Sequence, residues 1–377
     1  MFAYLAGFGW VGVPFFFVIS GYCIAAAGDS ARFKPRAVAK FFLRRFRRIY
    51  PPFWILLLLS FAIIAGTFCA GFPSIFSDHI YPIVSPFSLS PTQWVGNISL
   101  TETWRHFIWG NAEERFFLGH AWTLCYEEQF YAICGLALFL NRKWFFLALA
   151  WVSLFVVFAM ALQCHRAVSM EGFFFDGRWL VFAAGVLIYY RLNYADGLPA
   201  TFLDMTLIIG LYGSFLFHHK FQTMIGEELI WGFLFACVIR LLHCQDLSMA
   251  SSRWLRPVSL CGVMCYSLYL VHWPVVKGFS HLLYMAGVKN AWLTLCFTMP
   301  ACIVISVGLA WRFHTLVERR FLNTIPSLPE VSSSKALLPR VSTRDVEIIP
   351  VNPNFFRNFS RKNAPVDGRT PFGAAVN

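Results

Sequence analysis

Apolar runs long enough to cross a bilayer recur along this chain, and no other feature constrains its fold as strongly. A membrane-spanning helix needs about 20 mainly apolar residues, and 58% of the residues are hydrophobic while only 13% are charged. Such runs lie near 8–27, 50–70, 119–140, 144–163, 176–190, 200–217, 226–243, 257–276 and 291–311. The sequence therefore predicts an all-α fold, a polytopic integral membrane helical bundle with about nine transmembrane helices.

The net charge of +12 is distributed unevenly between the segments that join these runs. If Met1 lies outside, the cytosolic segments before residue 326 hold 17 lysines and arginines, and the outer segments hold seven. Cytosolic loops of membrane proteins are enriched in these residues. We therefore expect a multi-pass protein of the cell membrane, the bacterial inner membrane, with a cytosolic C-terminus and with membrane lipids around it. The charge then reflects orientation, so no nucleic-acid partner is expected.

The composition changes near Pro326, where Ser, Pro, Arg and Asn replace the apolar periodicity. We expect a transmembrane domain over 1–325 and a disordered cytosolic tail over 326–377. The 11 cysteines lie mostly within or at the ends of the apolar runs and show no paired spacing. They are interpreted as small core residues, and no metal site is predicted.

The third apolar run carries polar residues that a lipid-facing helix would not tolerate. It opens with HAWTLCYEEQFY, and His120, Thr123, Glu127, Tyr131 and Cys134 recur at steps of three or four residues, on one helical face. A charged residue at membrane depth costs about 2.5–3.5 kcal/mol and marks a functional site by default. A buried hydrogen-bond network that only fixes helix packing is the alternative.

The stretch FFLRRFRRIYPPFW contains four arginines and no lysine between Arg44 and Arg48. On a helix Arg44 and Arg45 lie one turn before Arg48, and the two prolines that follow are expected to end this approach and start the next span. Guanidinium groups bind phosphates bidentately, in a geometry that lysine does not reproduce. The cluster therefore indicates a phosphate-bearing cytosolic donor such as an acyl-CoA. An anchor for anionic lipids explains the same residues.

Two further apolar runs contain polar residues. In YSLYLVHWP, Pro274 is expected to kink or end the helix and to leave His272 near its outer end. His272 is interpreted either as a packing residue or as a catalytic one. In DGRWLVFAAG, Asp176 and Arg178 are expected at a helix start, as an ion pair or as interface residues.

The longest outer segment, 71–118, is rich in tryptophan and arginine. These residues are Trp94, Trp104, Arg105, Trp109 and Arg115. The rings could stack on sugars, and an interfacial aromatic belt explains the same residues.

Together these stretches resemble the acyltransferase 3 family of integral membrane O-acyltransferases. The matching stretches are FFFVISGYCI, RRFRRIYPPFW, HAWTLCYEEQFY, RWLVFAAGVLI, YSLYLVHWP and VERRF, in this order between about Gly12 and Phe321. The resemblance implies a ten-span acyltransferase. Such an enzyme would move an acyl group, commonly acetyl, from cytosolic acyl-CoA to a hydroxyl of a cell-envelope glycan or a similar acceptor.

Residues and resemblance together assign roles to individual positions. We expect Arg45 and Arg48, with Arg44 beside them, to bind the donor. The expected catalytic residues are Glu127, His120 and Tyr131, and the expected substrate-binding residues are Trp122, Thr123, Arg178 and His272. Thr123 stands where the family usually has serine, which keeps a hydroxyl.

The start of the chain departs from the family pattern. The family's first span carries a basic residue and, about eleven positions later, a histidine thought to act in catalysis. Only seven residues precede Phe8 here, and none is His, Lys or Arg. We expect either a start codon placed too late or a truncated, inactive member. Pro14 also replaces an aspartate that is common in the family.

Transfer of an acyl group to a hydroxyl needs a base for the hydroxyl proton and donors for the oxyanion. The base candidates are Glu127, His120 and His272. Glu127 and His120 are about 10 Å apart along one helix, so either water or substrate lies between them or a preceding span supplies the base. The second option is favoured, with Glu127 as a supporting or acceptor-binding carboxylate. A transporter or flippase for a glycan or lipid is the rival interpretation, because polar seams also line transport pathways.

Overall fold

The described part of the protein is built from helices. A computed structural model describes residues 7–34, 36–71, 84–109, 113–140, 143–166 and 171–322, and no strand occurs in these ranges. The prediction of an all-α fold is confirmed. The predicted tail, 326–377, lies outside the described residues.

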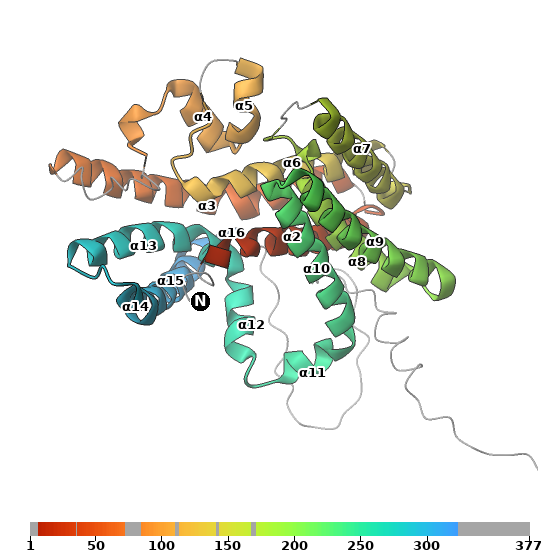
Figure 1. Cartoon of the computed structure of the whole chain (residues 1–377). Coiled ribbons are helices and arrows are strands. Elements are labelled where there is room, and N and C mark those ends of the chain that lie inside the picture. The colour runs from red at the N-terminus through yellow and green to blue at the C-terminus, as the bar shows by residue number, and fades with distance from the viewer. Residues whose placement is uncertain are drawn as a thin grey trace, which may run out of the picture. The chain divides into compact units, whose positions relative to one another are not determined.

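Each of the nine predicted apolar runs coincides with one of the helices or helix groups (Figure 1). The longer α-helices are α2 (Gly12–Ala31), α3 (Ala37–Cys69), α6 (Trp122–Leu140), α7 (Phe145–Arg166), α8 (Arg178–Tyr194), α9 (Gly197–Phe221), α10 (Met224–Leu242), α13 (Cys265–Met285) and α15 (Met299–Phe313). The shorter ones are α4 (Pro91–Ser99), α5 (Glu102–Trp109), α11 (Asp246–Ser251), α12 (Arg256–Val263), α14 (Ala291–Leu293) and α16 (Arg319–Phe321). The 3-10 turns are η1 (Gly7–Val11), η3 (Pro86–Ser88), η4 (Gly119–Ala121), η5 (Phe174–Asp176) and η6 (His243–Gln245), and the π turns are η7 (Thr294–Thr298) and η8 (His314–Glu318).

Five of the described helices are long and apolar enough to cross a membrane, or six if the bent pair α12 and α13 forms one span. The count of nine spans therefore stays a prediction. Helices α6, α8 and α10 fall short of this criterion, and each contains a buried charged residue, namely Glu127, Arg178 and Glu228. All three therefore carry a charged group inside the bundle.

Helix α2 lies against α3, α6, α8 and α10. Its contact with α8 is close because glycines face the neighbouring backbone. A Cβ on Gly21 would lie 2.0 Å from the carbonyl oxygen of Phe182, and a Cβ on Gly185 would lie 2.0 Å from that of Val18. Small residues of this kind let membrane helices approach closely, and they fix the face of α2 that reaches the candidate site.

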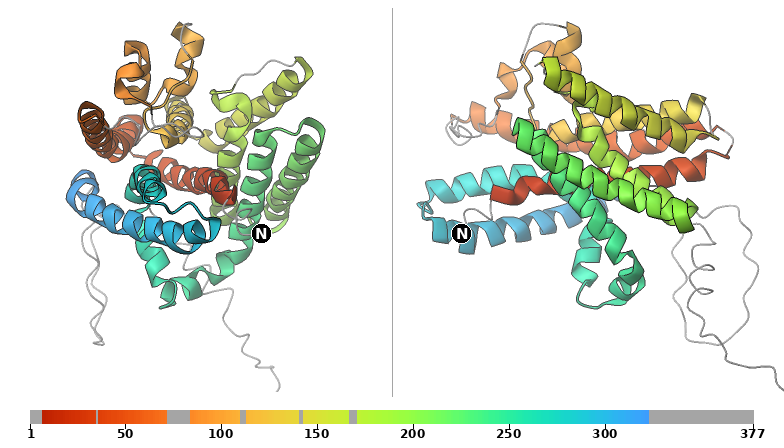
Figure 2. Two further views of the ribbon diagram at one scale, coloured as in Figure 1. Left: turned by 60° about the vertical axis from the view of Figure 1, so that its left-hand side comes forward. Right: turned by 45° about the vertical axis from the view of Figure 1, so that its right-hand side comes forward.

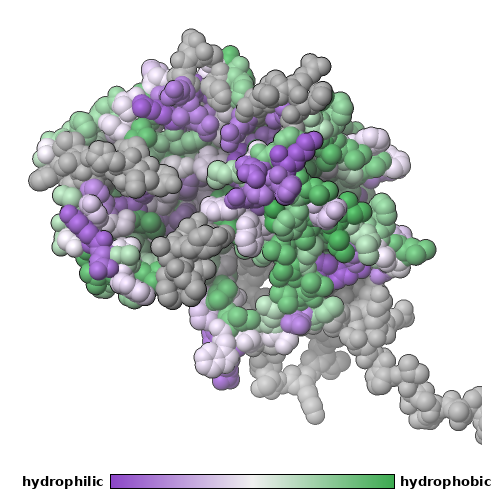
Figure 3. All heavy atoms as spheres, viewed as in Figure 1, coloured by the Kyte–Doolittle hydropathy of each residue, from purple (hydrophilic) through white to green (hydrophobic). Residues whose placement is uncertain are grey.

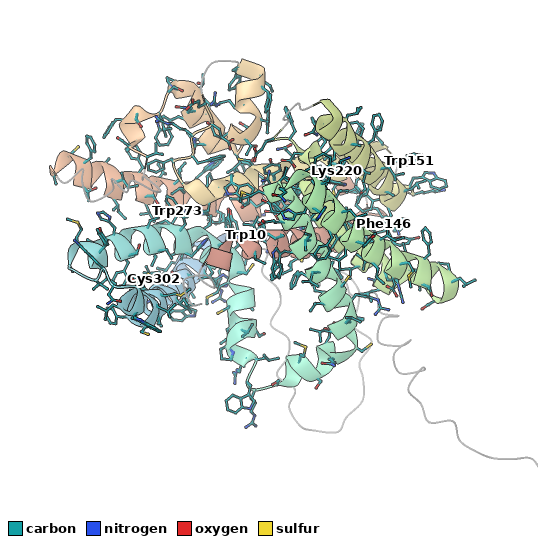
Figure 4. All side chains as sticks on the ribbon, in the orientation of Figure 1. Trp10, Phe146, Trp151, Lys220, Trp273 and Cys302 are labelled. Carbon is teal, nitrogen blue, oxygen red and sulfur yellow. The ribbon has the colours of Figure 1, made fainter. Side chains whose placement is uncertain are left out.

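The outer surfaces of several helices are apolar. Hydrophobic residues cover much of the face shown in Figure 3, and Trp151 of α7 is 65% exposed (Figure 4). Helices α13 and α15 lie side by side, as both views of Figure 2 show. A membrane bundle needs no hydrophobic contact to cover such surfaces, because lipid chains do so.

The proline pair in the arginine-rich stretch does not divide it from the next span. Pro51 and Pro52 lie inside α3, which is one continuous helix of 33 residues. The expected break there is wrong. Proline removes a helix hydrogen bond, but neighbouring groups compensate for this in membrane helices.

Pro274 also lies inside a helix, because α13 continues to Met285. The predicted helix end at this proline is wrong, and His272 is in the middle of α13 rather than near its end. The break occurs earlier, at Met264, where the backbone leaves the helical region (φ −103°, ψ 22°). Helices α12 and α13 meet there at 86°.

Candidate active site

The polar face of α6 is buried in protein, as its helical spacing predicts. Thr123, Glu127 and Tyr131 are each less than a tenth exposed, and Cys134 is fully buried. Glu128, which is rotated by about 100° from its neighbour, is half-buried and interacts electrostatically with Tyr50 instead. The two adjacent carboxylates are therefore surrounded by different residues.

Glu127 lies where α2, α3 and α6 meet. The hydroxyl of Ser20, on α2, donates a hydrogen bond to the Oε1 atom of Glu127. The hydroxyl of Tyr131, one turn further along α6, also bonds to this carboxylate. The buried carboxylate of Glu127 therefore accepts hydrogen bonds from two neutral hydroxyl groups, which do not neutralise its charge.

The arginines of α3 approach the same carboxylate from the other side. The guanidinium carbon of Arg45 lies 5.0 Å from the ring centre of Tyr131. Arg48 interacts electrostatically with Tyr131, Cys23 and Glu127. Arg44 is half-buried one turn before Arg48. The structure thus brings Arg45 and Arg48 to the middle of α6, where they face the predicted seam.

Ser20 offers a test of this arrangement. Ser20→Ala removes a hydrogen bond to a charged group, an interaction of about 1.5–3 kcal/mol. We expect transfer per folded molecule to fall by roughly tenfold or more. Ser30 is the matched control, because its hydroxyl donates to the Ala27 carbonyl of its own helix. An equal loss in Ser30→Ala would show that the effect of Ser20→Ala is not specific to Glu127.

At the other end of the seam His120 sits in an aromatic cluster. Its ring centre lies 5.0 Å from that of Tyr269, 5.5 Å from that of His272 and 5.7 Å from that of Trp273, which Figure 4 labels. The Tyr269 hydroxyl donates to the His120 carbonyl oxygen at 2.6 Å and lies 2.8 Å from the Thr123 hydroxyl.

Both ring nitrogens of His120 are buried and have no hydrogen-bond partner in the described part of the protein. Buried polar atoms are normally satisfied, so this histidine has bonding capacity that a bound molecule could use. Its neighbour His272 uses Nδ1 against the carbonyl oxygen of Tyr269, at 2.6 Å. His272 also lines a cavity of about 1130 Å³ between α13 and residues 291–307. The two predicted histidines are therefore brought together beside a cavity.

Arg178 is held in a buried ionic network rather than free in the site. Its Nε and Nη2 atoms donate to the carboxylate of Glu228, at 2.8 and 3.1 Å, and its Nη1 atom donates to Asp176 and to the Tyr126 hydroxyl, both at 2.8 Å. The ion pair with Asp176 confirms one of the two interpretations of this motif. Arg178 reaches the predicted substrate residues through Trp122, whose ring centre is 5.0 Å from its guanidinium carbon.

Sequence reasoning missed three of these residues. Ser20 and Cys23 are one turn apart on α2, and a polar pair at that spacing inside an apolar run was the available signal. Glu228 was detectable as a second carboxylate inside a predicted span. Nothing local indicated that Glu228 pairs with Arg178, 50 positions earlier in the chain.

Comparison with known proteins places the chain among membrane transferases. A family model described as an acyltransferase domain matches residues 1–311. ExoZ of Rhizobium meliloti, an exopolysaccharide production protein, is 28% identical over 284 residues, which cover 70% of this chain and 75% of ExoZ. "Putative membrane-bound transacylase BcsY" of Komagataeibacter xylinus is 27% identical over 304 residues, which cover 74% of this chain and 71% of BcsY. No solved structure matches.

Proposed function

The chain belongs to this acyltransferase family, a family of transferases other than aminoacyl transferases, and we propose that it moves an acyl group from a cytosolic acyl-CoA to a hydroxyl of a cell-envelope polysaccharide. The acyl group proposed is acetyl. The names of the two relatives support a polysaccharide acceptor and a membrane-bound transacylation. The apolar helices support a multi-pass membrane protein. The charge distribution favours a bacterial inner membrane location with a cytosolic C-terminus.

The observation that carries the proposal is the position of Glu127 between two groups of residues. Arg45 and Arg48 approach it from α3, and two neutral hydroxyl donors hold it. Arginine pairs suit the phosphates of a coenzyme A donor. The pantetheine arm of a donor bound by them would extend from these arginines along the polar face of α6 that carries Glu127.

The chemistry at this point is a displacement at the thioester carbonyl. The acceptor oxygen forms a bond to the carbonyl carbon, the carbon–sulfur bond breaks, and coenzyme A leaves as its thiol. Glu127 accepts the proton of the acceptor hydroxyl and passes it to the departing sulfur, while the Ser20 and Tyr131 hydroxyls hold the carboxylate in place. His120 and His272, further along the seam, bind the acceptor through their imidazole nitrogens, with Trp122 and Thr123 between them and Glu127.

An assay with purified protein tests the proposal. The protein in detergent or nanodiscs is supplied with radiolabelled acetyl-CoA and a polysaccharide carrying free hydroxyls. We expect label in the polysaccharide and free coenzyme A in equal amounts. Movement of a glycan across proteoliposomes without release of coenzyme A would favour a transporter. Absence of both activities in a monodisperse sample would contradict the enzyme.

A further inference from the structure

Part of the expected outer segment 71–118, namely η3 and α4 over residues 86–99, lies alongside the apolar part of α3. Phe87 of η3 lies 5.8 Å from Phe68, between ring centres, and Trp94 of α4 lies 5.8 Å from Phe61. At the far end of α4, the Trp54 indole contacts the carbonyl oxygen of Ile98.

These contacts place α4 antiparallel to α3, beginning near the C-terminal end of α3 and ending near its middle. The matching part of α3, from about residue 50 to residue 68, extends for about 27 Å at the helical rise. This length is close to the roughly 30 Å of a hydrocarbon core. It also coincides with a predicted span, 50–70, within a helix that satisfies the length and hydropathy criteria for crossing a membrane. An element packed along it lies at the same depth.

The polarity of α4 is the reverse of that of a helix on a water-facing surface. Its polar residues Gln93 and Asn97 point inward and are 5% and 2% exposed. Its apolar residues Val95 and Ile98 point outward and are 49% and 44% exposed. Exposed apolar faces of this kind mark contact with another apolar phase. The neighbouring helix α3 also exposes apolar residues, namely Leu58, Leu59 and Ile63.

The ends of α4 are closed by protein groups, as a hydrocarbon environment requires. At the N-terminus the Ser90 hydroxyl accepts from the Gln93 amide and the Gln93 side chain accepts from the Ser90 amide. At the C-terminus the carbonyl oxygens of Ile98 and Ser99 accept from the Trp54 indole at 2.9 Å and the Tyr50 hydroxyl at 3.2 Å. These carbonyls would otherwise depend on water.

The buried polar residues of α4 and α5 form hydrogen bonds with the backbone of residues 115–117, which leads into the candidate site. Asn97 donates to the carbonyl oxygen of Arg115 and accepts from the amide of Phe117, both at 2.8 Å. Glu102 accepts from the amide of Arg115 at 2.9 Å and pairs with the buried guanidinium of Arg105 at 2.7 Å. This backbone runs directly into His120, so α4 and α5 fix the start of the seam.

From this geometry we propose that η3, α4 and α5 form a re-entrant element whose outward face contacts the acyl chains of the lipid bilayer. The element separates lipid from the polar residues around His120. The Trp94 indole is not available for sugar stacking in this arrangement, because it donates to the carbonyl oxygen of Pro86 and packs against Phe117. The aromatic residues of this segment then belong to the membrane rather than to a water-filled loop.

Site-specific photo-crosslinking in proteoliposomes tests this proposal without relying on catalysis. Val95 and Ile98 are replaced one at a time by p-benzoylphenylalanine, and phospholipid adducts are measured by mass spectrometry after irradiation. Ile63, 62% exposed on α3, is the positive control, and Lys34, in the basic turn after α2, is the negative control. We expect adduct yields at Val95 and Ile98 within about threefold of the yield at Ile63, and none at Lys34.

Lipid adducts at Ile63 without adducts at Val95 or Ile98 would overturn the proposal. If a variant at Val95 does not yield monodisperse protein, Phe87 takes its place. Phe87 is 62% exposed, and its ring packs against that of Phe68 on α3. The outcome does not depend on whether the protein transfers an acyl group, so the two proposals can fail separately.

Discussion

We expect that replacing Glu127 with glutamine lowers acyl transfer by about 10²–10⁴-fold, the range that a positioned acid–base group contributes. Glutamine keeps the size of the side chain and still accepts from the Ser20 and Tyr131 hydroxyls, but it cannot take up the proton of the acceptor. The measurement is transfer per folded molecule, with expression and monodispersity checked for each variant.

Glu128→Gln is the matched control for this substitution. Glu128 carries the same charge one position later, but it is half-buried and lies beside Tyr50 of α3 rather than on the seam. We expect this variant to keep most of the activity. Equal losses in both variants, following protein yield, would indicate that Glu127 only holds helices together. Full activity in Glu127→Gln would end the proposal that this carboxylate takes part in the reaction.

The double substitution Arg45→Ala with Arg48→Ala weakens acyl-CoA binding by about 10²-fold or more. Hydrogen bonds to charged groups contribute about 1.5–3 kcal/mol each, and both side chains interact with the seam, Arg45 through the Tyr131 ring and Arg48 through the charge of Glu127. Titration calorimetry with a non-hydrolysable acyl-CoA analogue gives the affinity directly. Membrane insertion should be unchanged, because α3 keeps its apolar part.

Arg47 provides the control, because it belongs to the same cluster but is rotated by about 100° from Arg48 on the helix. Arg47→Ala removes one positive charge from the helix without touching the seam, so the affinity should change by less than about threefold. If the double variant binds the analogue as tightly as the native chain, the arginines serve only as an anchor for anionic lipid. If Arg47→Ala weakens binding of the analogue as much as the double substitution does, the loss of affinity comes from the change in net charge.

Much of the fold could be predicted because it depends on local patterns. Each predicted apolar run coincides with a helix or a helix group, whereas α4, α5 and α11 lie outside these runs, and the spacing of Thr123, Glu127 and Tyr131 predicted that the polar face of α6 is buried. A side chain on a membrane helix has to face protein if it is polar, wherever the neighbouring helices lie. The helix ends expected at Pro51 and Pro274 are wrong, because α3 and α13 continue through these prolines. In a membrane, neighbouring groups compensate for the helix hydrogen bond that a proline removes.

The partners of the seam could not be predicted, because they come from distant parts of the chain. Ser20 meets Glu127 across 107 positions, and His120 meets His272 through the packing of α13. The reversed polarity of α4 is also invisible in its nine residues until its neighbours are known. The sequence by itself determined the helices, the membrane class and the polar face of α6, since each follows from periodicity within one segment. Only the tertiary structure decided what surrounds Glu127 and where segment 84–118 lies, because those depend on contacts between helices.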